Sequence, residues 1–188
     1  MKSVSVSWDK EGGRFVALGS HAGHPIAINA PRAPEETRGS TGFSATELLL
    51  AGAGACSAWD VVEIVRKRRH QISSLDVTVE GEQQVDPPWT YRRVALHYRV
   101  TGEGLSFAVI GRVIRLSVVR YCSVIATVSA AADIVATVEL VGPDGSTTGR
   151  RPIELAIPAQ IVAVADEEAL GVEEPIADEE GDGTAGAD

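Results

Sequence analysis

Polar and apolar residues alternate along short segments at the start of the chain. Residues 3–8 have the sequence Ser-Val-Ser-Val-Ser-Trp, with the two-residue period of a strand that buries one face. Glycine-containing turns separate this segment from residues 14–18 and 24–29, which have similar patterns. We therefore predict a meander of three strands, followed by a polar loop over residues 30–41.

A long apolar segment over residues 44–70 predicts a helix. Ser44 is a favourable N-cap and Glu47 follows three residues later, which together form the capping-box pattern. The basic cluster at residues 66–69 falls at the opposite end, where positive charge complements the helix dipole. We assign the cluster to this role rather than to anion binding.

Two glycines lie in the middle of this predicted helix. Gly52 and Gly54 each cost about 1 kcal/mol relative to alanine in a helix interior, so their presence needs a packing reason. Gly52 and Cys56 share one helical face because they are four residues apart. We infer that another helix crosses at this point, in contact with the cysteine.

The second half of the chain contains further strand and helix patterns. It predicts, in order, two strands, two helices and a strand, at residues 71–84, 90–101, 105–121, 122–132 and 133–141. The expected buried face of the second strand comprises Val94, Leu96, Tyr98 and Val100. The apolar stripe of the longer helix comprises Ile110, Val113, Ile114 and Val118. The resulting order, βββ–α–ββ–αα–β, indicates an α+β protein.

The distribution of charge separates the C-terminal end of the chain from the rest. The 188 residues suit one domain, and their net charge is −9. Residues 166–188 hold ten acidic and no basic residues, so the preceding residues carry 17 basic against 16 acidic side chains. We predict a folded domain over residues 1–142, an extension without an assigned structure over 143–165, and a disordered acidic tail over 166–188.

Composition also bears on partners and location. The chain has no basic patch with interleaved aromatic residues, which argues against nucleic-acid binding. It has no run of 18 apolar residues without a polar break, so no membrane association is expected. Residues 1–8 lack the apolar centre of a secretion signal, and we expect a cytoplasmic protein.

The two cysteines carry the candidate chemistry. Cys56 lies within the long predicted helix, and Cys122 lies at the start of the last one. In the cytoplasm a disulfide is more often transient and catalytic than structural, so we interpret the two residues as a redox pair. They do not suffice for a four-ligand zinc site, and the four histidines are not spaced as ligands. We therefore expect no bound metal.

Two acidic residues follow Cys56 along the predicted helix. Asp60 and Glu63 lie four and seven residues later and share its face. A negative charge would raise the pKa of a nearby thiol, because it disfavours the thiolate. On this argument the two carboxylates oppose activation of the cysteine.

Three separate segments carry a resemblance to a known family. They are residues 42–62, 96–105 and 121–124, which include both cysteines. The chain resembles the OsmC/Ohr family of osmotically induced and organic-hydroperoxide-resistance proteins, most closely its OsmC-like branch, over residues 2–141. The resemblance implies the OsmC-like fold, in which the long central helix packs between sheets in an intertwined homodimer.

The resemblance also implies an activity. The thiolate of Cys56 would attack the terminal oxygen of an organic hydroperoxide and become a sulfenic acid. Cys122 would condense with that sulfenic acid to form a disulfide. An external dithiol reductant would then restore both thiols, and no bound cofactor would be needed.

The family activates its attacking cysteine with an arginine, which is held by a glutamate ten residues before the cysteine. In this chain that position is Thr46, and Glu47 is nine residues before Cys56. One residue rotates a side chain by about 100° around the helix axis. Arg38 in the preceding loop is the first candidate for the arginine and Arg32 the second. Arg38 and Glu47 are thus the candidate activating pair.

The sequence leaves two questions open. Cys122, close to a helix start, could have the lower pKa of the two thiols, so which thiol attacks is undecided. A thiol peroxidase for small organic or fatty-acyl hydroperoxides is the first functional hypothesis. The alternative is a non-catalytic dimeric scaffold or binder of apolar small molecules, with inert buried cysteines. A thiol hydrolase or a redox sensor would use the same two cysteines.

Overall fold

The protein contains two four-stranded sheets and a set of helices. The structure, a computed structural model, describes residues 2–20, 23–29, 42–142 and 144–157. The first sheet has the order β1 (Val4–Asp9), β2 (Arg14–Gly19), β3 (Ile26–Asn29) and β4 (Phe43–Ser44). The second has the order β5 (Ser74–Gln83), β6 (Tyr91–Thr101), β7 (Asp133–Val141) and β8 (Arg151–Ile153). The helices are α1 (Ala45–Lys67), α2 (Phe107–Leu116), the π-helical turn η2 (Ser117–Tyr121) and α3 (Ser123–Val128).

The predicted order βββ–α–ββ–αα–β and the α+β class are confirmed. Two short strands were not predicted: β4 pairs in parallel with β3, and β8 pairs antiparallel with β7. Strand β8 falls within the extension predicted over residues 143–165 and joins it to the second sheet. Residues 30–41 and the acidic tail over 166–188 lie outside the described residues.

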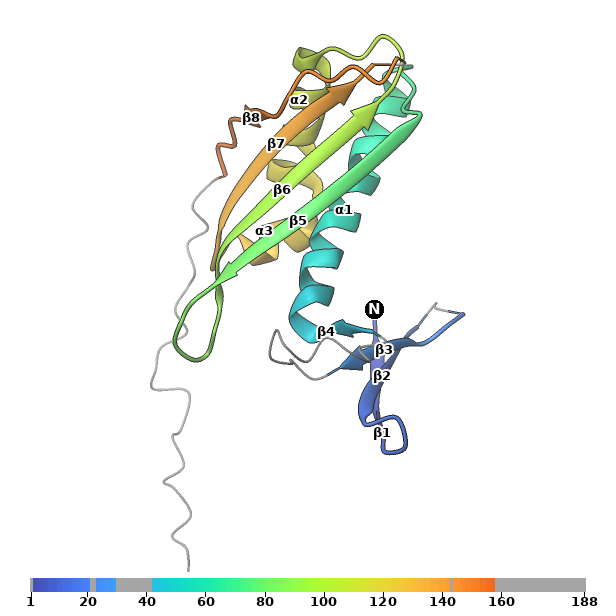
Figure 1. Cartoon of the computed structure of the whole chain (residues 1–188), viewed down its shortest axis with the longest axis vertical. Helices are drawn as coiled ribbons and strands as arrows, with labels where there is room; N and C mark the ends of the chain where they lie inside the picture. Colours follow the sequence, from blue (N-terminus) through green and yellow to red (C-terminus); the bar gives the residue numbers. More distant parts are fainter. Residues whose placement is uncertain (1, 21–22, 30–41, 143, 158–188) are drawn as a thin grey trace, which may run out of the picture.

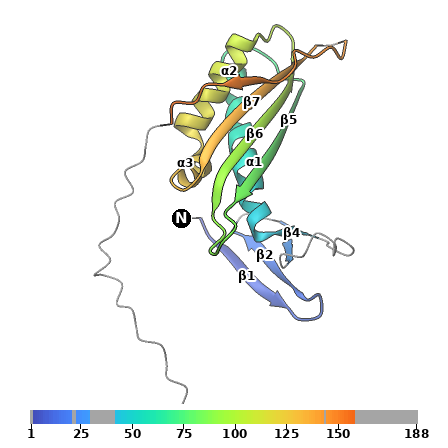
Figure 2. The ribbon, with the colours of Figure 1, turned by 60° about the vertical axis from the view of Figure 1, so that its left-hand side comes forward.

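The connection between β6 and β7 explains where the shorter helices lie. These two strands are parallel, and a parallel pair requires a crossover connection. The segment α2–η2–α3 supplies it and packs on the same face of the second sheet as α1 (Figure 1, Figure 2). The long helix therefore lies beside the short ones against the second sheet, and the N-terminal strands lie at its N-terminal end (Figure 1).

The main core lies between the second sheet and these helices. The strand residues predicted to be buried are all in it: Val94, Leu96, Tyr98 and Val100. So is the predicted stripe of the crossover helix: Ile110, Val113, Ile114 and Val118. Alternation with a period of two on β6, and helical spacing on α2, thus identified both sides of the core correctly.

Helix α1 begins as predicted and ends earlier. The capping box is present, because Glu47 N–H donates to Ser44 Oγ at 3.2 Å and Ser44 N–H donates to Glu47 Oε2 at 2.7 Å. The helix ends at Lys67 rather than at residue 70, since Arg69 has a positive φ of 62°. Arg66 and Lys67 occupy the last turn, where the positive charge complements the dipole.

The second helical region differs from the prediction. A helix was expected over residues 105–121, but the α-helical part ends at Leu116 and the chain continues as a wider π turn. This turn closes with Cys122 N–H donating to the carbonyl of Ser117 at 2.9 Å. The following helix covers Ser123–Val128 rather than residues 122–132, and Cys122 is its N-cap.

The two glycines of α1 have different neighbours. A Cβ at Gly54 would lie 2.8 Å from Val79 Cγ2, so this glycine allows β5 to approach the helix. A Cβ at Gly52 would lie 4.0 Å from Val124 Cγ1 in α3. The inferred helix crossing beside Cys56 is therefore confirmed at Gly52, whereas at Gly54 the close neighbour is a strand of the same chain.

Helix α1 is long and apolar enough to span a membrane by length and composition alone, with a mean hydropathy of 1.6 over its most apolar window. The polar residues within α1 do not lower its hydropathy enough to exclude a membrane span, contrary to the expectation from the sequence. However, Ala53, Val61 and Val65 belong to the same buried core as β6 and α2. We therefore assign α1 as a core helix of the folded domain.

Candidate functional site

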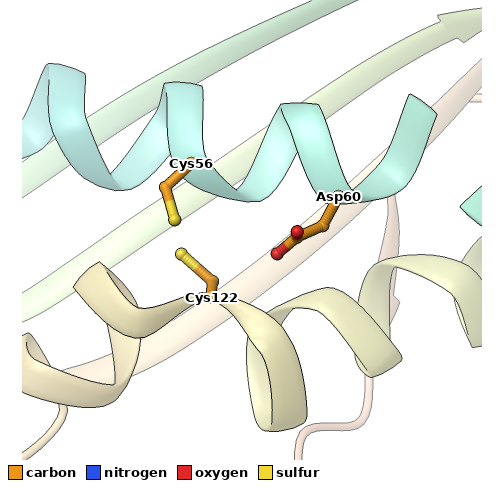
Figure 3. A group of neighbouring side chains, drawn as sticks. All are labelled: Cys56, Asp60 and Cys122. Carbon is orange, nitrogen blue, oxygen red and sulfur yellow. The ribbon is translucent and has the colours of Figure 1, made fainter. Parts of the chain in front are cut away.

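The two cysteines meet where the crossover segment passes over α1. Cys56 projects from the middle of α1 and is half-buried, whereas Cys122 sits between η2 and α3 with 1% of its surface exposed. Both are free, and their sulfur atoms lie within 4.8 Å of each other. The two side chains point toward one another (Figure 3). The wide η2 turn leads directly into Cys122 and sets the position of its side chain.

A third side chain completes this group. Asp60 lies one turn after Cys56 on α1, and one of its carboxylate oxygens is within 4.8 Å of both sulfur atoms. The carboxylate points toward the two thiols (Figure 3). Sequence analysis placed Asp60 on the face of Cys56 but gave it only an unfavourable role. The chemistry of the site must include this carboxylate.

A series of hydrogen-bonded hydroxyl groups extends from Asp60 into the core. Ser117 Oγ is 3.3 Å from Asp60 Oδ2 and 3.0 Å from Ser57 Oγ. Ser57 in turn bonds the hydroxyl of Tyr98 on β6. Ser57, Ser117 and Tyr98 are fully buried, so these bonds satisfy groups that would otherwise be costly to bury. Nothing in the spacing of these residues in the sequence indicated that they meet.

The environment of Cys122 raises the pKa of its thiol, whereas its place near a helix start suggested a lowered pKa. Burial raises the pKa of the Cys122 thiol to about 12, because the desolvated site disfavours the thiolate, and the adjacent Cys56 adds to this. The N–H of Ile125 donates to Cys122 Sγ at 3.5 Å and acts in the opposite direction. The effect of burial on the pKa is larger than that of the hydrogen bond, so the suggestion that a helix start gives Cys122 a low pKa is wrong.

This difference in environment has a measurable consequence. In the reduced native protein at pH 8, iodoacetamide is expected to alkylate Cys56 well before Cys122, because only a thiolate reacts and Cys122 is both protonated and buried. Peptide mass mapping after a short exposure reports which residue is modified. In denaturant the two rates should become similar. Equal rates in the native protein would contradict the assigned burial of Cys122.

Of the candidate activating residues, Glu47 is not part of this group. Glu47 is held at the start of α1 by Ser44, whose backbone N–H lowers the pKa of the Glu47 carboxyl. Nine residues of helix separate it from Cys56, a rise of about 13 Å. Arg38 and Arg32 lie outside the described residues. The structure thus brings together Cys56 and Cys122 and shows Glu47 in its capping role.

Glu47 also borders an apolar groove on another side of α1. The groove has a volume of about 410 Å³ and lies between α1 and β5. Its apolar lining includes Phe43, Leu50, Val77 and Val79. Neither cysteine lines it, so the groove and the thiol pair are separate features of this chain.

Comparison with known proteins gives consistent results. Residues 37–137 match the family model described as OsmC-like protein. The chain is 33% identical over 122 residues to protein YhfA of Escherichia coli K12, a match that covers 65% of this chain and 87% of YhfA.

Solved structures share the fold at lower sequence identity. An OsmC-like protein from Mycoplasma pneumoniae superposes with a TM-score of 0.64 at 20% identity, covering 75% of this chain and 97% of that one. The organic hydroperoxide resistance protein OhrB of Bacillus subtilis gives a TM-score of 0.53 at 13% identity, covering 73% and 97%. At these identities the likeness concerns the fold alone.

Proposed function

The chain belongs to the OsmC-like protein family, and from this premise we propose that it is a thiol-dependent peroxidase for organic hydroperoxides. The observation that carries the proposal is the pair of free thiols that face each other at the crossing of α1 and the α2–α3 segment (Figure 3). One of the two is half-buried and the other is buried, as an attacking and a resolving thiol require.

Cys56 is the attacking residue in this proposal. Its thiolate attacks the terminal oxygen of the hydroperoxide, and the O–O bond breaks. The electron pair leaves with the alkoxide, which takes up the proton lost by the thiol and departs as an alcohol. Cys56 is left as a sulfenic acid, the first reversible step of cysteine oxidation.

Cys122 resolves the sulfenic acid. Its sulfur attacks the sulfur of Cys56, and the hydroxyl group leaves as water together with the Cys122 proton. The sulfur atoms must close from within 4.8 Å to the bond length of about 2.05 Å. Because burial raises the pKa of the Cys122 thiol, this thiol loses its proton only as its sulfur attacks. An external dithiol returns the disulfide to two thiols.

Activation of Cys56 requires a positive charge, because Asp60 disfavours a thiolate beside it. We assign this charge to Arg38, which the sequence places in the loop before α1. Glu47 is the carboxylate proposed to orient it, in addition to capping the helix. Free thiols are maintained in reducing compartments, and we propose a cytoplasmic location.

The proposed assembly is a homodimer. Among the described residues, β1, β2 and β3 contribute no side chain to the buried core, although a sheet normally packs one face against another layer. Helix α1 also exposes large apolar side chains, with Trp59 72% and Val62 40% accessible. A second copy that covers these surfaces would bury them, in agreement with the intertwined dimer that the resemblance implies.

The activity is tested by following cumene hydroperoxide consumption by the reduced protein in the presence of a dithiol. The rate per thiol should exceed that of free cysteine, and cumene hydroperoxide should be consumed faster than hydrogen peroxide. A rate equal to that of free cysteine under the same conditions would reject the peroxidase proposal.

One observation favours the alternative function. The apolar groove between α1 and β5 is within the usual size range of small-molecule sites. A scaffold or binder would hold an apolar ligand there and leave both cysteines inert. Binding of a fluorescent fatty acid that is lost on Leu50→Asp, combined with a negligible peroxide rate, would support this alternative.

A further inference from the structure

We propose that Cys56, Asp60 and Cys122 form a binding site for a thiophilic divalent cation of the Zn²⁺ class in the reduced protein. The three side chains each offer one ligand atom, and these atoms all lie within 4.8 Å of one another. They come from two different elements, α1 and the start of α3, and converge on one point (Figure 3). This group is not evident in the sequence, because Cys122 is distant from Cys56 and Asp60 along the chain.

The spacing fits a tetrahedral ion after a small contraction. Zinc binds sulfur at about 2.3 Å and carboxylate oxygen at about 2.0–2.2 Å, which places ligand atoms roughly 3.6–3.8 Å apart. The atoms of this group therefore need to approach by about 1 Å at most. Rotation of the Cys56 and Asp60 side chains, which lie one helical turn apart, can supply that movement.

The charges of the group also favour a cation. Metal binding converts both thiols to thiolates, and without a cation these two thiolates and the carboxylate would repel one another in a largely buried place, where uncompensated charge is costly. A divalent cation compensates two of these three charges, and its binding releases the two thiol protons. Two sulfur ligands select Zn²⁺ or Cd²⁺ over Mg²⁺ or Ca²⁺, which prefer oxygen.

Hydrogen bonds orient two of the three ligands. The hydroxyl of Ser117 lies 3.3 Å from Asp60 Oδ2 and 3.1 Å from the Ser57 carbonyl, so its one proton is shared between these two acceptors and helps to position the carboxylate. The N–H of Ile125 donates to Cys122 Sγ at 3.5 Å. Partners of this kind determine how ligands are presented to a metal, and their loss commonly weakens binding.

Three protein ligands leave the fourth position of a tetrahedral ion open to water or to a small exogenous ligand. A bound cation would occupy the sulfur lone pairs that attack a hydroperoxide. The reduced protein would then exist in a metal-bound, oxidation-resistant form. The proposal needs only free thiols, so it stands whether or not the protein is a peroxidase.

The test uses the full chain, reduced and then separated from the reductant by gel filtration without oxygen, in the absence of peroxide. Titration with Co²⁺ should produce a thiolate-to-cobalt charge-transfer band that saturates at one equivalent per chain, and Zn²⁺ should remove it. Zinc should also protect Cys56, the cysteine that is alkylated first in the metal-free protein, from alkylation. Absence of the charge-transfer band in the wild-type protein would overturn the proposal.

Three variants with a matched control assign the ligands. Asp60→Asn should weaken Co²⁺ binding about tenfold or more, whereas Glu63→Gln, the same change on the same helix outside the group, should leave it unchanged. Cys56→Ser and Cys122→Ser should each weaken the charge-transfer band. Circular dichroism establishes that each variant is folded. Equal affinity in folded Asp60→Asn, or an undiminished band in either folded cysteine variant, would overturn the three-ligand site.

Discussion

Replacing Cys56 by serine is expected to abolish hydroperoxide turnover, with kcat/KM falling by about three orders of magnitude or more. A serine hydroxyl is not ionised at neutral pH and forms no sulfenic acid, so the first step has no nucleophile. The measurement is steady-state cumene hydroperoxide consumption with excess dithiol. Turnover retained in Cys56→Ser would show that a different residue attacks.

The companion variant separates the two roles. Cys122→Ser should consume about one equivalent of hydroperoxide and leave a sulfenic acid on Cys56, which dimedone traps as a stable adduct. Because Cys122 is fully buried, Cys122→Ala serves as a second variant with the same expected result. An adduct on the remaining thiol of Cys56→Ser, and none in Cys122→Ser, would reverse the assignment of attacking and resolving residues.

Replacing Gly54 by alanine is expected to destabilise the protein by about 1–3 kcal/mol, the usual cost of overpacking a core. The new Cβ would lie 2.8 Å from Val79 Cγ2 on β5, and a β-branched valine has little rotamer freedom to move aside. Urea unfolding followed by circular dichroism measures the free energy of unfolding directly.

A second glycine supplies the control for this prediction. Gly111 lies inside α2, and among the described residues no atom other than those of its chain neighbours and of the helix backbone is within 4 Å of the Cβ that alanine would add. Gly111→Ala should therefore raise the free energy of unfolding by up to about 1 kcal/mol, through helix propensity alone. If Gly54→Ala stabilised the protein as Gly111→Ala does, the close approach of α1 to β5 would be wrong.

The fold followed from patterns that are local in sequence. Alternation on β6 and the stripe on α2 report burial directly, so both faces of the main core were predicted. The π turn η2 was not, since its residues continue an apolar helical pattern and only the hydrogen bond of Cys122 N–H to Ser117 reveals it. Strand β8 was missed because its three residues, Arg151, Pro152 and Ile153, give it no strand pattern.

The site was predictable in part for a similar reason. Cys56 and Cys122 are recognisable as cysteines on apolar segments, and the structure places them face to face. The role of Asp60 depends on where Cys122 and Ser117 lie, and these residues are distant from it in sequence. The sequence therefore placed Asp60 on the same helical face as Cys56, but it did not indicate that Asp60 belongs to a three-residue group.

The central claim is that Cys56 and Cys122 act as one redox pair, and intact mass measures this most directly. Reduced protein is mixed with one equivalent of cumene hydroperoxide and quenched with acid at short times, and its intact mass is measured by mass spectrometry. We predict a rapid loss of two hydrogens, which is reversed by a dithiol and absent in both cysteine-to-serine variants. A gain of oxygen without loss of hydrogen in the wild-type protein, or oxidation no faster than that of free cysteine, would contradict the account.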